Sequence, residues 1–149
     1  MGNRYRRLFY RLWRLLPHRV QDLLIYLGAP KVTLGVLAII RDRKGRLLLL
    51  HHTYRRQAWG FPGGLARRGE PPEEALAREL REELGTAARI GPLLHADYCV
   101  RRHHLTLYYD ATVAGSVHHS RETDAHRYAA PEDLPGLLGA ALPPWLHTS

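Results

Sequence analysis

The sequence is poor in cysteine and in uninterrupted apolar segments. Its 149 residues include one cysteine, Cys99, so an internal disulfide and a cysteine-rich metal cluster are both excluded. Arginines interrupt the first apolar segment every three or four residues, and we therefore expect neither a secretory signal peptide nor a membrane-spanning helix. These features exclude a secreted disulfide scaffold. They predict a cytoplasmic protein, with a location peripheral to a membrane as the alternative.

Acidic residues are almost missing from residues 1–31. Seven arginines and lysines stand there against one acid, Asp22, which leaves this segment with a formal charge of +6. The whole chain carries +8, so residues 32–149 contribute only +2. A basic chain of this size is often a nucleic-acid binder. Because the charge is confined to one segment, we do not expect sequence-specific binding to nucleic acid.

The basic segment has the periodicity of an amphipathic helix. At 100° per residue, Arg4, Arg7, Arg11 and Arg14 gather on one side of a helix and the apolar residues on the other. Pro17 ends this helix, and a second apolar run over residues 20–27 closes with Gly28 and Pro30. We therefore predict a helical extension over residues 1–30. Its apolar side consists of Tyr5, Leu8, Phe9, Leu12, Trp13, Leu15 and Leu16.

The apolar side of this extension needs a surface to cover it. We expect it to pack on the protein's own domain or on a second subunit, which would make the protein a homodimer. Contact of residues 1–28 with a membrane surface is the first alternative, since basic amphipathic helices bind lipid headgroups. Contact with a phosphate backbone is the second.

Residues 31–149 have the pattern of one domain. With 45% hydrophobic residues, the chain can close one core. Strands on both sides of a central helix predict an α/β (α+β) sandwich. The expected elements are a hairpin of strands over 32–40 and 46–52, a second strand pair over 93–100 and 104–114, a short strand over 126–129, and helices over 72–84 and 131–138.

Three glutamates share one face of the central helix. Glu79, Glu82 and Glu83 are spaced i, i+3 and i+4, beside an apolar stripe that anchors the helix to a core. Like charges at this spacing each cost a few tenths of a kcal/mol, so the cluster favours a cation that neutralises it. Carboxylate oxygens favour Mg²⁺ or Mn²⁺. A solvated, salt-bridged helix face is the alternative.

A glycine-rich loop, WGFPGG over residues 59–64, precedes this helix. Its glycines permit tight turns and let a backbone approach a metal or a phosphate closely. Loop and helix together fit the pattern G-x5-E-x7-R-E-U-x-E-E-x-G-U, in which U is a bulky apolar residue. This pattern resembles the Nudix box, here at residues 64–86, and it departs only at Thr86. The matching residues are Gly64, Glu70, Arg78, Glu79, Leu80, Glu82, Glu83 and Gly85.

The resemblance implies a Nudix-type α/β/α sandwich with an N-terminal helical extension. It also implies Mg²⁺- or Mn²⁺-dependent cleavage of the pyrophosphate bond in a small nucleotide, a nucleoside diphosphate linked to another group. By the same resemblance, the catalytic set is Glu79, Glu82 and Arg78, the metal ligands are Gly63, Glu79, Glu82 and Glu83, and Gly64, Glu70 and Gly85 are structural. A further metal ligand is expected outside the box, with Glu122 as the candidate and Asp97 and Asp124 as its competitors.

Substrate contacts outside the box are less marked in the sequence. Arg55 and Arg56 are candidates for binding substrate phosphates, and Trp59 for stacking on a base, while a solvated surface is the alternative for each. The histidines are assigned to the surface or to packing, because neighbours in a strand point to opposite faces. Two alternative functions remain: a catalytically silent nucleotide-binding module, and a pyrophosphohydrolase for nucleoside triphosphates or RNA ends.

Overall fold

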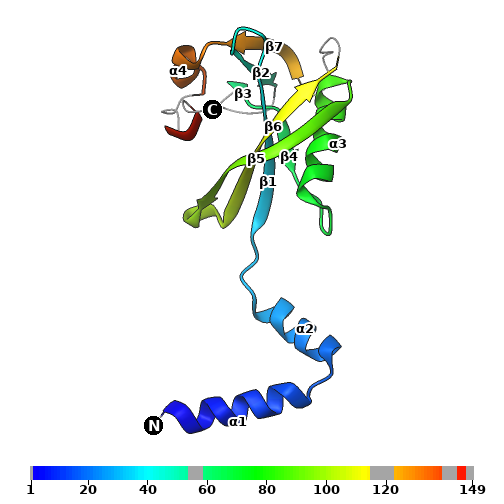
Figure 1. Cartoon of the computed structure of the whole chain (residues 1–149), viewed down its shortest axis with the longest axis vertical. Helices are drawn as coiled ribbons and strands as arrows, with labels where there is room; N and C mark the ends of the chain where they lie inside the picture. The colour runs from blue at the N-terminus through cyan, green and yellow to red at the C-terminus, as the bar shows by residue number, and fades with distance from the viewer. Residues whose placement is uncertain (1, 54–58, 115–122, 139–143, 147–149) are drawn as a thin grey trace. The chain divides into compact units, whose positions relative to one another are not determined.

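The computed structural model describes residues 2–53, 59–114, 123–138 and 144–146 (Figure 1). The chain divides into two compact units, Met1–Lys31 and Val32–Ser149. The first unit contains helices α1 (Gly2–Leu15) and α2 (His18–Gly28). The second contains the strands, the remaining helices and the acidic cluster.

The two helices predicted for the basic segment are confirmed. Pro17 stands between them in an extended conformation, and its fixed φ suits the residue before a helix. The Gln21 side-chain amide donates 2.9 Å hydrogen bonds to the Trp13 and Leu16 carbonyl oxygens. Gln21 therefore caps the end of α1, where the Trp13 carbonyl oxygen also accepts a 3.2 Å hydrogen bond from the Leu16 backbone N–H.

Among the described residues, no helix combines the length and the apolar composition of a membrane-spanning segment.

The second unit holds two sheets. The four-stranded sheet has the order β4-β1-β6-β5, formed by Gly63–Leu65, Thr33–Ile40, His104–Val113 and Ala88–Cys99. Strands β1 and β6 are parallel, and the other pairs are antiparallel. The three-stranded sheet has the order β3-β2-β7, formed by Trp59–Gly60, Leu47–His52 and Thr123–Ala129.

The two strands predicted over residues 32–40 and 46–52 and the turn between them are confirmed, but the expected hairpin does not continue beyond that turn. Strands β1 and β2 form, but they belong to different sheets and are joined only by a bridge between Arg41 and Leu47. The reason is that β1 is a central strand, with β4 bonded to one edge at Gly35–Leu37 and β6 to the other along the whole strand, so β2 cannot extend its pairing along β1. Between the strands, the Asp42 carboxylate accepts 2.9 Å hydrogen bonds from the Lys44 and Arg46 backbone N–H groups, and this side-chain turn redirects the chain.

The second predicted strand pair is confirmed as β5 and β6, although β5 begins at Ala88 rather than at residue 93. Gly91 and Pro92 hide this early start, because both residues interrupt the sequence pattern of a strand. Since β5 is an edge strand and its register shifts between Ile90 and Leu93, the proline is accommodated there. The short strand expected over 126–129 is also confirmed, as part of β7 against β2.

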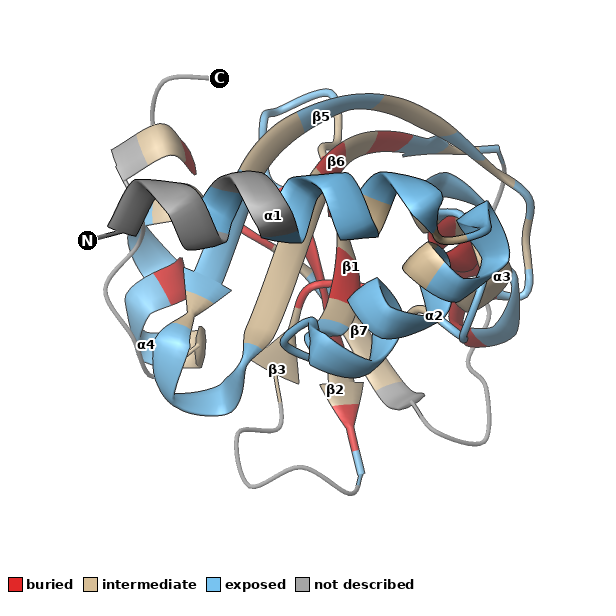
Figure 2. Ribbon diagram, turned by 90° about the horizontal axis from the view of Figure 1, so that it is seen from below, coloured by how far each residue is buried: buried red, intermediate tan, exposed pale blue. Residues whose placement is uncertain are grey.

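Helices cover both faces of the sheets. Helix α3 (Pro72–Leu84) packs Leu76 and Leu80 against Val36 and Ala38 of β1, in a first core cluster. Helix α4 (Leu134–Leu138) and a 3-10 turn at Pro144–Leu146 cover the opposite side, in a second cluster around Ile39. Figure 1 shows α3 and α4 on opposite sides of the strands. The expected α/β/α sandwich is confirmed, and Figure 2 shows its buried residues along β1, β6 and α3.

Candidate active site

Helix α3 is bounded by the residues that the sequence indicated. It begins with Pro71 as the N-cap and Pro72 in the first turn, and it ends at Gly85, whose φ of 64° is the left-handed cap conformation. Leu76, Leu80 and Leu84 are fully buried, as expected for the anchoring stripe. Their burial sets the rotation of the helix and turns its glutamates toward the loop before it.

A cavity of about 550 Å³ lies at the junction of this helix with β1, β4 and β6. It brings together the three glutamates, the arginine and the paired glycines that the sequence singled out. It also contains residues of β1 and β6 that are remote from the box in sequence. Its walls are formed by Gly35, Leu37, Gly63, Gly64, Leu65, Arg67, Arg78, Glu79, Glu82, Glu83, His104 and Thr106.

The two glycines of β4 make room for two of the carboxylates. Glu83 is buried, and its Oε2 accepts a 2.7 Å hydrogen bond from the Gly63 backbone N–H. A side chain on Gly64 would place its first carbon only 2.5 to 2.7 Å from the carboxylate atoms of Glu79. Glycine at these positions therefore allows the backbone of β4 to approach α3 closely.

Arg78 holds the acidic side chains in place. It donates two parallel hydrogen bonds to the Glu70 carboxylate, at 2.8 and 2.9 Å, so the pairing expected between Arg78 and Glu70 is present. The same guanidinium donates to Glu79 at 2.7 Å and to Glu82 at 3.4 Å. Hydrogen bonds from Arg78, and a further one from the Arg67 backbone N–H, lower the pKa of Glu70 to about 2.

The donor set fits a hard divalent cation. Glu79, Glu82 and Glu83 line one cavity, and carboxylate oxygens are the ligands that Mg²⁺ and Mn²⁺ prefer. Within the described parts of the chain, no three His, Cys, Asp or Glu side chains form a ready-made cage around one metal position. Mg²⁺ does not require such a cage, because it usually binds one or two carboxylates together with water and substrate phosphates.

His52 is a neighbour of the acidic cluster that the sequence did not reveal. Its Nδ1 lies 3.9 Å from Oε1 of Glu83, and both side chains are buried. The sequence assigned the histidines to the surface or to packing. That assignment could not anticipate this contact, because the end of β2 and the end of α3 meet only through the tertiary structure.

His104 is the second such neighbour. The Oγ1 of Thr33 lies 2.8 Å from its Nδ1, which holds the imidazole over Gly35. A side chain on Gly35 would place its first carbon 2.8 Å from Nε2 of His104. His104 and Thr106 alternate along β6 and line the same wall of the cavity.

Some of the predicted site residues lie elsewhere. Arg55, Arg56 and Glu122 are outside the described residues, as is the side chain of Asp124. Asp97 lies on β5 opposite Thr106, and among the described residues it is not part of the cavity wall.

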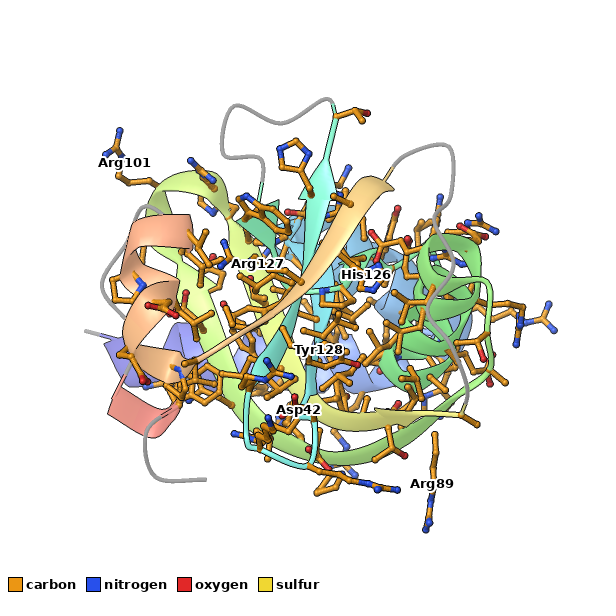
Figure 3. The ribbon with its side chains drawn as sticks, turned by 90° about the horizontal axis from the view of Figure 1, so that it is seen from above. Asp42, Arg89, Arg101, His126, Arg127 and Tyr128 are labelled. Atoms are coloured by element: carbon orange, nitrogen blue, oxygen red, sulfur yellow. The ribbon has the colours of Figure 1, made fainter. Side chains whose placement is uncertain are left out.

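Trp59 forms part of β3, and it too is not among the described residues that line the cavity. Its ring packs edge-on against His51, with ring centroids 5.1 Å apart. The guanidinium of Arg127, labelled on β7 in Figure 3, lies 6.0 Å from the Trp59 ring centroid. In this position Trp59 packs against protein side chains on the three-stranded sheet.

The departure from the box at Thr86 has a structural explanation. The Thr86 hydroxyl donates a 2.7 Å hydrogen bond to the Ala114 carbonyl oxygen, which follows strand β6. A polar contact thus joins the end of α3 to the sheet where an apolar residue would pack. The departure lies away from the acidic cluster and leaves its geometry intact.

Residues 31–148 match the model of the NUDIX domain, and the chain belongs to this family. Similar solved structures include the MutT protein of Methanosarcina mazei Go1, with 26% identity and a TM-score of 0.62 over 81% of this chain and 92% of that one. The MutT NUDIX hydrolase of Burkholderia pseudomallei has 29% identity and a TM-score of 0.63 over 80% of this chain and 95% of that one.

Curated relatives have several different names. An RNA pyrophosphohydrolase of Actinobacillus succinogenes is 32% identical over 108 residues, which are 63% of this chain and 54% of that protein. An ADP-ribose pyrophosphatase of Mycobacterium tuberculosis is 44% identical over 59 residues, 36% of this chain and 28% of that protein. The chain spans about half or less of the length of these relatives.

Proposed function

We propose that this protein is a divalent-metal-dependent hydrolase that cleaves the pyrophosphate bond of a nucleoside diphosphate linked to another group. The observation that carries the proposal is the convergence of Glu79, Glu82 and Glu83 with the Gly63–Gly64 backbone on one cavity. Membership of the family supports it, as do relatives named pyrophosphohydrolase and pyrophosphatase.

In this proposal the site residues have separate roles in metal binding and in positioning. Glu82 and Glu83 would hold Mg²⁺ or Mn²⁺ together with the Gly63 carbonyl oxygen, and Glu122 would add a ligand from outside the box. A bound divalent cation would neutralise charge that develops on the phosphates and lower the pKa of the attacking water. Arg78 is a positioning residue, because its hydrogen bonds orient the carboxylates of Glu79 and Glu82.

The chemical step is a hydrolysis. Water attacks one phosphorus atom, and the bond from that phosphorus to the bridging oxygen breaks, so that two phosphate products leave. Glu79 either accepts the proton of the water as a general base or acts as a further metal ligand. The hydrogen bond from the Gly63 backbone N–H would hold the buried Glu83 carboxylate in place for this step.

The rest of the substrate would extend along β1 and β6. Gly35, His104 and Thr106 line the same cavity as the box residues, and His104 and Thr106 offer a flat imidazole and a hydroxyl. Arg55, Arg56 and Trp59 stay candidates for phosphate and base contacts. The substrate is a small nucleotide in this proposal. The proposed location is the cytoplasm, which contains such nucleotides and keeps a single cysteine reduced.

Two alternative functions are a different substrate and a binding role without cleavage. Relatives named for RNA, ADP-ribose and CTP all match, so a triphosphate or an RNA 5′ end is the alternative substrate. A catalytically silent module would bind nucleotides without cleaving them. The intact acidic cluster favours catalysis, because every box acid that the proposal assigns to the metal or to the attacking water is present.

The experiment is a screen for cleavage. The full-length protein is incubated with nucleoside diphosphate derivatives, nucleoside triphosphates and 5′-triphosphorylated RNA, each with Mg²⁺ or Mn²⁺, and the released phosphates are identified by chromatography. Cleavage of a linked diphosphate into two phosphate products supports the proposal. Binding measured by calorimetry with no cleavage of any substrate would overturn it in favour of the silent module.

A further inference from the structure

Helix α1 exposes large apolar side chains next to arginines. Phe9 and Leu12 are more than half exposed, and Leu15 is 80% exposed. At 100° per residue, Phe9 and Leu12 lie on one side of the helix, Arg11 and Arg14 lie on the other, and Leu15 lies at the border between the two. Such a helix presents two chemically different faces to whatever covers it.

Helix α2 continues the exposed apolar surface. None of its residues is buried, and Leu27, for example, is 66% exposed. Figure 2 shows the described parts of both helices mainly in the colour of exposed residues. The exposed large apolar residues of α2 are Val20, Leu23, Leu24, Ile25, Tyr26 and Leu27.

Charge selects the kind of surface that fits these helices. Residues 1–31 carry a formal charge of +6 with Asp22 as the only acid, and residues 32–149 are themselves slightly positive. A second copy would cover the apolar face but would bring two segments of +6 together. A nucleic acid would neutralise the arginines but would leave the apolar face in water. An anionic bilayer satisfies both faces at once.

We propose that residues 2–28 bind the surface of an anionic lipid bilayer. The apolar sides of α1 and α2 enter the boundary between headgroups and acyl chains, and the arginines contact lipid phosphates. A 14-residue helix with five arginines suits the headgroup plane, since these charges are stable only in contact with water and phosphate. The aromatic side chains of Phe9, Tyr10 and Trp13 suit the same boundary region. The proposal is independent of the hydrolase activity.

The test is flotation of the full-length protein with lipid vesicles. Vesicles of phosphatidylcholine with about 30% phosphatidylglycerol are compared with phosphatidylcholine alone, at about 0.15 M salt. We expect binding to the anionic vesicles to be at least about tenfold stronger, and to weaken as salt is raised. Equal binding to both vesicles would overturn the proposal, because charge would then have no part in it.

Two double variants separate the contributions of charge and apolar surface. Arg11→Glu with Arg14→Glu should abolish the preference for anionic vesicles, and the matched control is Arg89→Glu with Arg101→Glu. Figure 3 shows both control side chains pointing away from the second unit. The control changes the net charge equally, and it should keep binding within about twofold because its charges lie outside the proposed lipid-binding residues 2–28.

The apolar pair is Leu12→Asp with Leu24→Asp. It should abolish flotation, while Leu93→Asp with Val100→Asp, two exposed positions of the second unit, should not. All variants alter exposed residues, so we expect the midpoint of thermal unfolding to stay unchanged. A lowered midpoint would identify a variant that loses binding because it is less well folded. Equal loss of binding in test and control variants would overturn the proposal.

The other partners are outcomes of the same experiment. A protein that ignores anionic vesicles but sediments as a dimer through residues 2–28 would overturn the proposal in favour of a second copy. A protein that ignores vesicles but binds single-stranded RNA through Arg11 and Arg14 would overturn it in favour of a nucleic acid.

Discussion

The Gly63 backbone N–H donates a 2.7 Å hydrogen bond to the buried carboxylate of Glu83, and this bond joins strand β4 to helix α3. Breaking this bond would leave a buried polar group without a partner, which is costly in a protein interior. Because Gly63 and Glu83 are neighbours of the other box residues, the bond sets the distance between the glycine backbone and the acidic helix. The geometry of the cavity therefore depends on glycine at position 63.

Gly63→Ala should destabilise the fold. The φ of Gly63 is 129°, and a side chain there would collide with the Val36 carbonyl oxygen of β1. We expect the free energy of unfolding in urea to fall by about 3 kcal/mol, from backbone strain and overpacking together. The control is Gly45→Ala, with a φ of 76° but open space around it, which should lose only about 1 kcal/mol. Equal losses would show that the contact with Val36 is unimportant.

Glu82→Gln and Glu83→Gln should abolish most of the hydrolysis. Each substitution removes a charged ligand and keeps the shape of the side chain, so we expect a loss of about 100-fold or more in turnover with Mg²⁺. An excess of chelator should do the same to the unaltered protein. The side chain of Glu82 is 53% exposed, and the unfolding free energy of Glu82→Gln should therefore change by less than about 0.5 kcal/mol.

The matched control for these variants is Glu74→Gln, at an exposed position in the first turn of α3 and outside the cavity wall. This variant removes the same charge from the same helix. Because Glu74 lies outside the cavity wall, turnover should stay within about twofold of that of the unaltered protein. Full turnover of Glu82→Gln and Glu83→Gln would contradict the assignment of these residues as metal ligands.

Glu70 should make stability depend on pH in acid. Hydrogen bonds from Arg78 lower its pKa from 4.5 to about 2 in the folded protein. A carboxyl with a lowered pKa stabilises the fold above its unfolded pKa, and this contribution is lost as pH falls through the folded value. Glu70→Gln should therefore be less stable than the unaltered protein above about pH 4.5, and the difference should vanish by about pH 2.

Urea titrations over this pH range measure the effect. Arg78→Gln, alone and combined with Glu70→Gln, completes a double-mutant cycle whose coupling energy should shrink over the same range. A difference that stays constant with pH would show that the Arg78–Glu70 pair is not its source.

Gly35→Ala should displace the His104 ring from the cavity wall. The added carbon would lie 2.8 Å from Nε2 of His104, at the far end of a side chain that can rotate away, so the protein should still fold. If substrate extends over this wall, KM should rise by about tenfold while kcat changes less, because the contact is made equally before and during the reaction.

His104→Ala should produce a similar rise in KM, and the double variant should add little to it, because both changes remove one contact. Independent, additive effects of Gly35→Ala and His104→Ala would contradict this interpretation. Thr33→Val, which removes the hydroxyl beside Nδ1 of His104, should give a smaller rise in KM.

The acidic helix and its glycine loop were predictable because their determinants are local. Prolines at the start of α3, Gly85 at its end and leucines at every fourth position define the helix and its buried side. The same periodicity places Glu79, Glu82 and Glu83 together. The pairing of Arg78 with Glu70 followed from the resemblance of residues 64–86 to the Nudix box.

Strand partners were harder to predict, because strands bond to residues that are remote in sequence. The pattern of residues 32–40 and 46–52 indicates two strands but does not indicate that both edges of β1 are taken, by β4 at Gly35–Leu37 and by β6 along the whole strand. A turn sequence between two strands favours a hairpin only where an edge is free.

The sequence by itself determined the class of site, the identity of its acids and the two-faced character of residues 1–30, since helical spacing, capping and charge are properties of neighbouring residues. Only the tertiary structure decided that His52 contacts Glu83, that Gly35, His104 and Thr106 line the cavity, and that β1 and β2 separate into two sheets. These relationships depend on which strands share hydrogen bonds. The alternation of residues in a strand predicts which of its side chains are buried, but it does not identify the strand with which it pairs.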